Sequence, residues 1–204
     1  MKKRFAVAAY RLSVSVLAAG TVLAQTVDGF FHPPFDYLDY FSFFSVQSNL
    51  LTSVILTASA IRIFRGGRME NLTFWRGAAT LYLTLAGAVY FVLLNGASES
   101  LRTPREQTNA VLHYLVPAAL LGDWFFADKE PIAFRVGLAW LSYPLLYVLY
   151  SLVRGRVIGW YPYSFLNPND SGYSGVVGTC LVMAIAMTGF IALLTRSTRL
   201  TPPT

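Results

Sequence analysis

Long runs of apolar residues, separated by short polar connections, dominate the chain. A helix that crosses a lipid bilayer needs roughly 20 predominantly apolar residues. Six segments meet this requirement, at about 5–26, 40–62, 76–97, 108–127, 134–153 and 173–195. The pattern therefore predicts an all-α, polytopic membrane protein, in which residues 1–204 form a single domain of six transmembrane helices.

Composition supports the same class of protein. The 204 residues are 55% hydrophobic and 13% charged, whereas a soluble domain has about 25% charged residues. Cys180 is the only cysteine, which excludes an internal disulfide and argues against a thiolate metal site. The two histidines and the lack of an acidic cluster in the spans give no metal site either, so we expect no metal and no cofactor.

The basic residues indicate the orientation of the spans. A net charge of +6 would suggest nucleic-acid binding in a soluble chain, but here the basic residues flank the spans and set topology, so we expect no nucleic-acid partner. With the N-terminus inside, eleven of them lie in the cytoplasm and four outside, which predicts that both termini are cytoplasmic. We expect the first span to remain uncleaved, because its apolar run is long and five spans follow. The inner residues are Lys2, Lys3, Arg4, Arg62, Arg65, Arg68, Arg76, Lys129, Arg135, Arg196 and Arg199; the outer are Arg102, Arg105, Arg154 and Arg156.

The second predicted span carries a polar stripe. At 100° per residue its polar side chains fall within an arc of about 140°, with Gln47 on the opposite side. Hydroxyl groups often bond neighbouring helices in membranes, so helix packing alone would account for the stripe. Its members are Ser42, Ser45, Ser48, Asn49, Thr52 and Ser53.

A histidine lies within the fourth predicted span. An ionisable group at membrane depth is costly and usually faces a functional cavity. Ser45 and His113 lie roughly 8 and 9 Å below the outer ends of their spans, so they share one layer. Asn49 and Asn109 lie one turn away from them, and Asn95 falls in the same half of the bilayer.

These side chains supply the minimum set for nucleophilic catalysis. A hydroxyl nucleophile needs a base to take its proton, and amide groups can stabilise an oxyanion. We therefore expect Ser45 and His113 to be catalytic, with Asn49, Asn109, Ser48 and Asn95 binding substrate or the oxyanion. No acidic residue is evidently placed to orient the imidazole. Asp36 and Asp39 at the outer mouth are candidates, whereas Asp123 lies too deep.

The outer connections are rich in aromatic residues and proline. Tyr161 and Tyr163 belong to the segment Gly159-Trp160-Tyr161-Pro162-Tyr163. Such residues form belts at membrane interfaces. They are equally compatible with a lid over an acyl-chain cavity, in which Tyr161 and Tyr163 would contact substrate.

Three segments together resemble the androgen-induced and androgen-dependent family of integral-membrane hydrolases, and its bacterial relatives most closely. They are Phe44-Ser45-Val46-Gln47-Ser48-Asn49-Leu50-Leu51, Asn109-Ala110-Val111-Leu112-His113 and Gly159-Trp160-Tyr161-Pro162-Tyr163. The resemblance implies that Ser45 takes the position of the family's threonine nucleophile and His113 that of its histidine. It also implies hydrolysis of fatty acid esters of hydroxy fatty acids and a place in a bacterial cytoplasmic membrane.

The leading interpretation is thus an intramembrane hydrolase whose Ser-His dyad cleaves a membrane lipid or lipid-like ester from the outer half of the bilayer. One alternative is a non-enzymatic protein that binds or transports a lipid or small molecule. In a third, purely structural interpretation, Ser45 and His113 only pair helices.

Overall fold

The computed structural model describes residues 2–94 and 106–199, and their regular structure is entirely helical, which confirms the all-α class. The π-helical turns are η1 (Tyr90–Leu94) and η2 (Val111–Leu115), and the 3-10 turns are η3 (Leu138–Leu141) and η4 (Ser164–Leu166). The α-helices are α1 (Lys2–Phe31), α2 (Tyr37–Phe41), α3 (Phe44–Phe64), α4 (Thr73–Val89), α5 (Glu106–Ala110), α6 (Val116–Phe126), α7 (Phe134–Gly137), α8 (Ser142–Ile158) and α9 (Pro168–Ser197).

Four helical segments of the described chain are long and apolar enough to cross a membrane, which is fewer than the six spans predicted. The other two predicted spans are helical but made of shorter pieces. Residues 76–97 fall on α4 and η1 and end outside the described residues, and residues 108–127 fall on α5, η2 and α6. The four long segments are Lys2–Phe31, Phe44–Phe64, Phe134–Ile158 and Pro168–Ser197.

The second predicted span begins later than the hydrophobic pattern indicates. α2 ends at Phe41, and the chain turns at Ser42 and Phe43 before α3 starts. Ser42 therefore does not lie on the helix that carries Ser45, so its place in the polar stripe was wrong. The remaining stripe residues are all buried on α3, which confirms that this face looks into the bundle; they are Ser45, Ser48, Asn49, Thr52 and Ser53.

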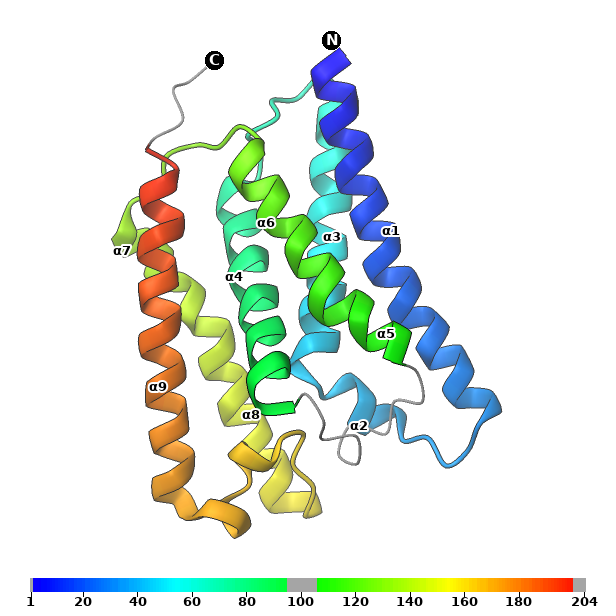
Figure 1. Cartoon of the computed structure of the whole chain (residues 1–204), viewed down its shortest axis with the longest axis vertical. Coiled ribbons are helices and arrows are strands. Elements are labelled where there is room, and N and C mark those ends of the chain that lie inside the picture. Colours follow the sequence, from blue (N-terminus) through cyan, green and yellow to red (C-terminus); the bar gives the residue numbers. More distant parts are fainter. Residues whose placement is uncertain (1, 95–105, 200–204) are drawn as a thin grey trace.

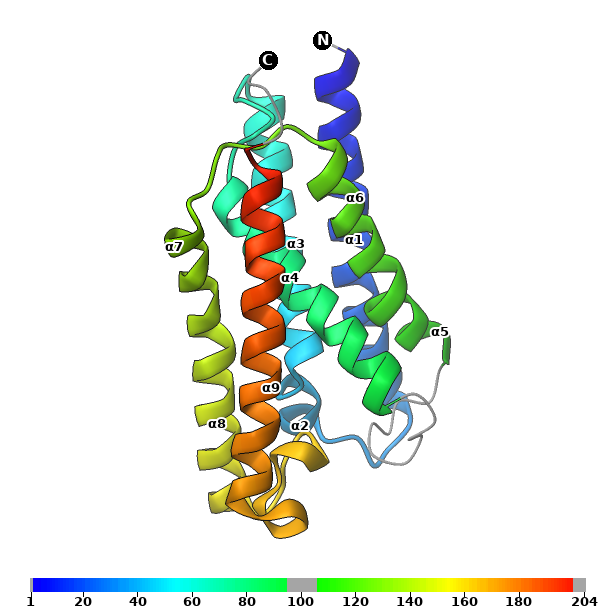
Figure 2. The same cartoon turned by 60° about the vertical axis from the view of Figure 1, so that its left-hand side comes forward.

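The helices form one bundle in which α3 and α4 are central (Figure 1). α1 packs along α3, and the segment from α5 to α6 crosses them next to α4. α8 and α9 form the opposite side of the bundle (Figure 2). The start of α1 and the end of α9 lie at the same end of the molecule (Figure 1).

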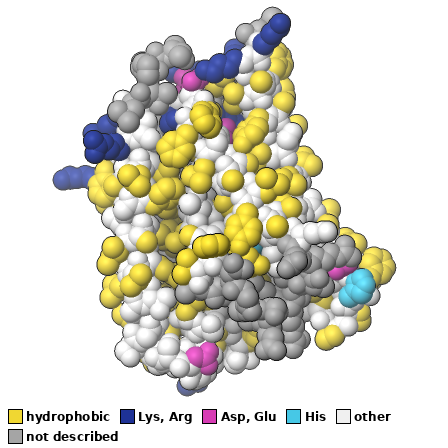
Figure 3. Space-filling model, viewed as in Figure 1, with side chains coloured by type: hydrophobic (Ala, Val, Ile, Leu, Met, Phe, Trp, Pro, Cys, Tyr) yellow, Lys and Arg dark blue, Asp and Glu magenta, His cyan; other side chains and the backbone are white. Residues whose placement is uncertain are grey.

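The surface has the polarity expected of a protein in a bilayer. Apolar side chains cover the middle of the face in Figure 3, whereas most of its visible Lys and Arg side chains gather at the end where α1 begins. Large apolar side chains such as Leu145, Val182 and Ile185 of α8 and α9 are 68–72% exposed. Burying such a surface in lipid removes it from water, so the molecule is consistent with an integral membrane protein.

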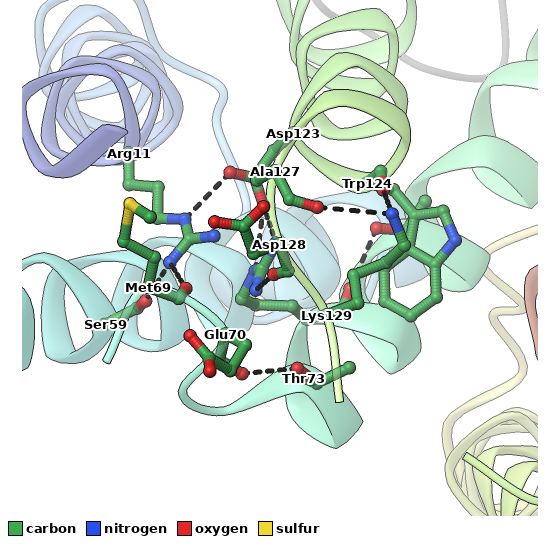
Figure 4. Close-up of polar contacts among 12 residues, drawn as sticks. Arg11, Ser59, Met69, Glu70, Thr73, Asp123, Trp124, Ala127, Asp128 and Lys129 are labelled. Atoms are coloured by element: carbon green, nitrogen blue, oxygen red, sulfur yellow. Dashed lines mark hydrogen bonds and ion pairs between the residues drawn. The ribbon is translucent and has the colours of Figure 1, made fainter. Parts of the chain in front are cut away.

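A buried ionic cluster joins four helices near that same end (Figure 4). Arg11 of α1 donates from Nε to Oδ1 of Asp123 of α6 at 2.8 Å. Arg76 of α4 donates from Nε to Oδ2 of the same carboxylate, also at 2.8 Å. Arg11 further donates from Nη1 to Ser59 Oγ of α3 and to the carbonyl of Met69, both at 2.8 Å. Both arginines are at most 1% exposed.

This cluster is a strong constraint on how the helices can slide. Charges in a low-dielectric interior are tolerated only when they are paired and hydrogen-bonded. A shift of one helical turn, about 5.4 Å, would separate the guanidinium groups from the carboxylate. The cluster therefore fixes the register of α6 against α1, α3 and α4.

Replacing Asp123 with asparagine should destabilise the fold strongly. The substitution keeps the side chain's size but leaves two buried guanidinium groups facing a neutral amide, and breaking a buried pair costs about 3–5 kcal/mol. The midpoint of thermal unfolding in detergent measures the effect. Glu130→Gln, at an exposed position near the same end, is the matched control. Equal midpoints for the two variants would show that the cluster does not hold the fold.

Candidate functional site

Ser45 and His113 line one cavity. Its volume is about 370 Å³, and it lies between α4, α8 and α9, with α3 and η2 at one side. The remaining lining is mostly apolar and comprises Phe44, Leu85, Ala86, Val89, Leu141, Ser142, Pro144, Leu145, Tyr147, Val148, Tyr163, Phe165, Leu166, Cys180, Met183, Ala184 and Met187. The sequence predicted the layer that these two residues share, and the fold brings both to one apolar space.

Ser45 stands in the first turn of α3. The N-cap residue, Phe43, offers no side-chain acceptor, so the first N–H groups of the helix have no side-chain cap. The hydroxyl of Tyr163 lies beside the Ser45 side chain and the backbone of Phe44 and Ser45. A helix N-terminus favours negative charge, so this environment suits a developing oxyanion.

Tyr163 lies in the connection between α8 and α9, packed among aromatic rings. Its ring stacks on Phe165 at 5.0 Å between centroids and meets Phe43 edge-on at 5.6 Å. Burial raises the pKa of Tyr163 to about 12. The hydroxyl therefore keeps its proton at neutral pH and can donate a hydrogen bond into the cavity.

His113 lies in the π-helical turn η2, a type of irregularity that is frequent at functional sites. Its Nδ1 is 3.1 Å from the carbonyl oxygen of Asn109. A carbonyl oxygen can only accept a hydrogen bond, so Nδ1 must carry the proton. In the neutral ring Nε2 then has a free lone pair, which is the state a general base requires.

Two residues of the α4 side position the imidazole. Tyr90 stacks on His113 with 4.3 Å between ring centroids and 15° between the planes. Gly87 lets the backbone of η2 come close to α4, because a Cβ atom at residue 87 would lie 2.5 Å from the carbonyl oxygen of His113. Gly87 thus determines how near η2 lies to α4.

Ser45 and His113 do not form a direct hydrogen bond among the described residues, although both face the cavity. Catalytic hydrogen bonds are often long without substrate and tighten when it binds. The helices that carry the two residues are in contact, since Asn49 Nδ2 of α3 donates to the carbonyl of Leu112 in η2 at 3.5 Å.

The other predicted site residues have different placements. Asn49 is fully buried, and its Nδ2 also donates to the Ser45 carbonyl at 2.8 Å, so it links α3 to η2. Asn109 acts on His113 through its backbone carbonyl. Ser48 is buried beside Tyr143 rather than at the cavity wall. Tyr161 packs against Gly155 of α8, outside the cavity lining. Asn95 lies outside the described residues.

Sequence reasoning did not find the α8 and α9 walls. Cys180, Met183, Ala184 and Met187 have helical spacing of three and four residues, which is the signal of one helix face. Neighbouring faces of α9 that point to lipid are equally apolar, so spacing alone cannot separate them. Within residues 2–94 and 106–199 no group of three or more His, Cys, Asp or Glu side chains is placed to hold a metal ion.

Comparison with known proteins adds no assignment. No family model matches the sequence, and neither a curated protein nor a solved structure matches the chain.

The position of the proton on His113 can be measured directly. The nitrogen shifts of ¹⁵N-histidine-labelled protein should show a neutral ring protonated at Nδ1, because the Asn109 carbonyl holds that proton. His32 is the only other histidine, so the signals can be assigned with a His32→Ala variant. A ring protonated at Nε2 instead would contradict the orientation that we describe.

Substituting Gly87 with alanine should disturb His113. The new methyl group meets the His113 carbonyl and must push η2 away from α4. The imidazole signals of His113 should therefore shift while those of His32 stay in place. Gly178→Ala on α9, where nothing lies within 4 Å of an added Cβ, is the matched control. If both variants leave the His113 signals unmoved, Gly87 has no positioning role.

Proposed function

We propose that the protein is an intramembrane hydrolase that cleaves lipid esters, with Ser45 as nucleophile and His113 as general base. The observation that carries the proposal is the cavity that Ser45 and His113 share, in which Nδ1 of His113 is held by a carbonyl so that Nε2 is free. An ester with an apolar chain fits the mostly apolar lining. The resemblance of three segments to the androgen-induced and androgen-dependent hydrolases points the same way.

The reaction proceeds in two steps. The Ser45 oxygen attacks the ester carbonyl while its proton moves to Nε2 of His113, and a bond forms between Oγ and the carbonyl carbon. The bond to the alcohol oxygen then breaks, and His113 returns the proton to the departing alcohol. In the second step water, activated by His113, attacks the acyl-Ser45 ester and releases the carboxylic acid.

Two kinds of donor stabilise the oxyanion. The hydroxyl of Tyr163 and the first N–H groups of α3 lie around Ser45, where negative charge develops on the former carbonyl oxygen. This arrangement assigns to Tyr163 and the α3 backbone the role that the sequence suggested for asparagine side chains. Asn49 instead holds Ser45 and η2 together.

The proposal includes six spans with both termini in the cytoplasm of a bacterium. In this topology, α4 with η1 forms one further span and α5 with η2 and α6 forms another, in addition to the four long segments. The ionic cluster lies at the basic, inner end and Ser45 near the outer end, so the ester reaches the site from the outer leaflet. The exposed apolar faces of α8 and α9, next to the cavity, suit a lipid that enters sideways.

Binding without catalysis is the second candidate. It is favoured by the lack of a direct Ser45–His113 hydrogen bond among the described residues and by the predominantly apolar lining. In that case the polar residues hold a lipid or another small amphiphile, which is recovered unchanged.

Ester hydrolysis by purified variants separates these functions. We expect Ser45→Ala and His113→Ala to lower kcat at least about 10³-fold, since each removes a partner of the nucleophilic step. Ser53→Ala on the same helix and His32→Ala in the exposed connection should keep the wild-type rate. The hydrolase assignment fails if Ser45→Ala and His113→Ala are as active as their controls.

Tyr163→Phe tests the oxyanion donors separately. Loss of one donor should lower kcat by about 10²-fold and leave KM nearly unchanged, because the hydroxyl acts mainly on the charge of the transition state. Tyr173→Phe, at an exposed position on α9, provides the comparison. A change confined to KM would mean that Tyr163 only binds the ground state.

A further inference from the structure

The two long walls of the cavity run side by side along the bundle. The end of η3 and the start of α8 contribute residues from Leu141 to Val148, and α9 contributes residues from Cys180 to Met187. Seven residues of helix correspond to about 10 Å along its axis. Phe44 meets Tyr147 at 5.1 Å between ring centroids, so the first turn of α3, with Ser45, lies beside the outer part of the α8 wall. The cavity therefore extends from Ser45 toward the middle of the bundle.

The inner end of the cavity on α9 lies next to a tight contact between helices. Met187 is 3% exposed and is the deepest cavity residue on α9. Just beyond it, α7 and α9 touch at Gly137, where an added Cβ would lie 2.9 Å from the side chain of Ile191 and 2.8 Å from that of Thr195. Met187 is thus the last side chain between the cavity and this tight contact.

We propose that Met187 sets the maximum length of the straight apolar chain that the cavity accepts. The inference rests on the proposed function in that the chain is the acyl part of its ester. Each methylene that leaves water for the cavity strengthens binding about fourfold. Once the chain reaches Met187, further methylenes find no space, so the gain per carbon stops.

This role differs from ordinary packing by Met187. A methionine that only fills the core would, on truncation, lower stability without altering which chain binds best. A methionine that ends the cavity would, on truncation to alanine, open space toward Gly137 and Ile191. The preferred chain then becomes longer by the carbons that fill this space.

The test measures binding without hydrolysis. Cys180 lines the cavity and is the only cysteine, so a bound chain should slow its alkylation by N-ethylmaleimide. A homologous series of straight-chain methyl ketones, which have no ester bond, serves as the ligand set. Protection of Cys180 is titrated for each ketone in the full-length protein, the Met187→Ala variant and the Ile185→Ala variant. Ile185 is 72% exposed on α9 and controls for a general loss of apolar surface.

We expect protection to strengthen about fourfold per carbon up to one length and then to level off. Met187→Ala should move that length upward, Met187→Phe should move it downward, and Ile185→Ala should leave it unchanged. The Phe variant keeps the proposal testable if the Ala variant does not fold. Protection that grows identically with chain length in all folded variants overturns the inference.

The result is separable from the hydrolase proposal. If the chain length at which protection levels off changes with the residue at position 187, and the protein has no esterase activity, the role of Met187 is supported and catalysis is refuted. If ester hydrolysis depends on Ser45 but the limiting chain length does not change with residue 187, catalysis is supported and the role of Met187 is refuted.

Discussion

The carboxylate of Asp123 is shared by two buried arginines and sets the register of the helices around it. It accepts hydrogen bonds from Arg11 of α1 and Arg76 of α4, and Arg11 also reaches Ser59 of α3. Two guanidinium groups with at most 1% exposure need this partner, because an unpaired buried charge is far more costly than a paired one. Four helices thus share one fixed point. His113 lies ten residues from Asp123 in the continuous helical segment of α5, η2 and α6, so its depth follows from the same point.

A second set of contacts positions Ser45 and His113 within this helix arrangement. Asn49 bonds the carbonyls of Ser45 and Leu112, which holds the first turn of α3 against η2. Gly87 allows η2 to approach α4, and Tyr90 stacks on the imidazole. The Asn109 carbonyl then fixes the tautomer of His113, which a carboxylate does in a triad. In the mechanism that we propose, a backbone carbonyl of α5 therefore takes the orienting role that an acidic side chain has in a triad.

Residue patterns predicted part of this arrangement. The hydrophobic pattern predicted the all-α class and the buried face of α3, and Ser45 and His113, which it assigned to one layer, line one cavity. The helical projection was wrong for Ser42, because it assumes one continuous helix, whereas the chain turns between α2 and α3. The pairing of Arg11 with Asp123 was missed, because the residue pattern within one span does not show which other helix packs against it. The cavity walls on α8 and α9 were missed because lipid-facing and cavity-facing side chains are equally apolar. Asn95 and the six-span topology remain predictions.

The most direct measurement is the identification of the residue that a fluorophosphonate modifies. These reagents form a stable bond with an activated serine, and the modified peptide is found by mass spectrometry. We predict one adduct, on Ser45, which disappears in the His113→Ala variant because the hydroxyl is no longer activated. An adduct on another residue, or an adduct on Ser45 that persists without His113, would show that these two residues do not form a catalytic dyad.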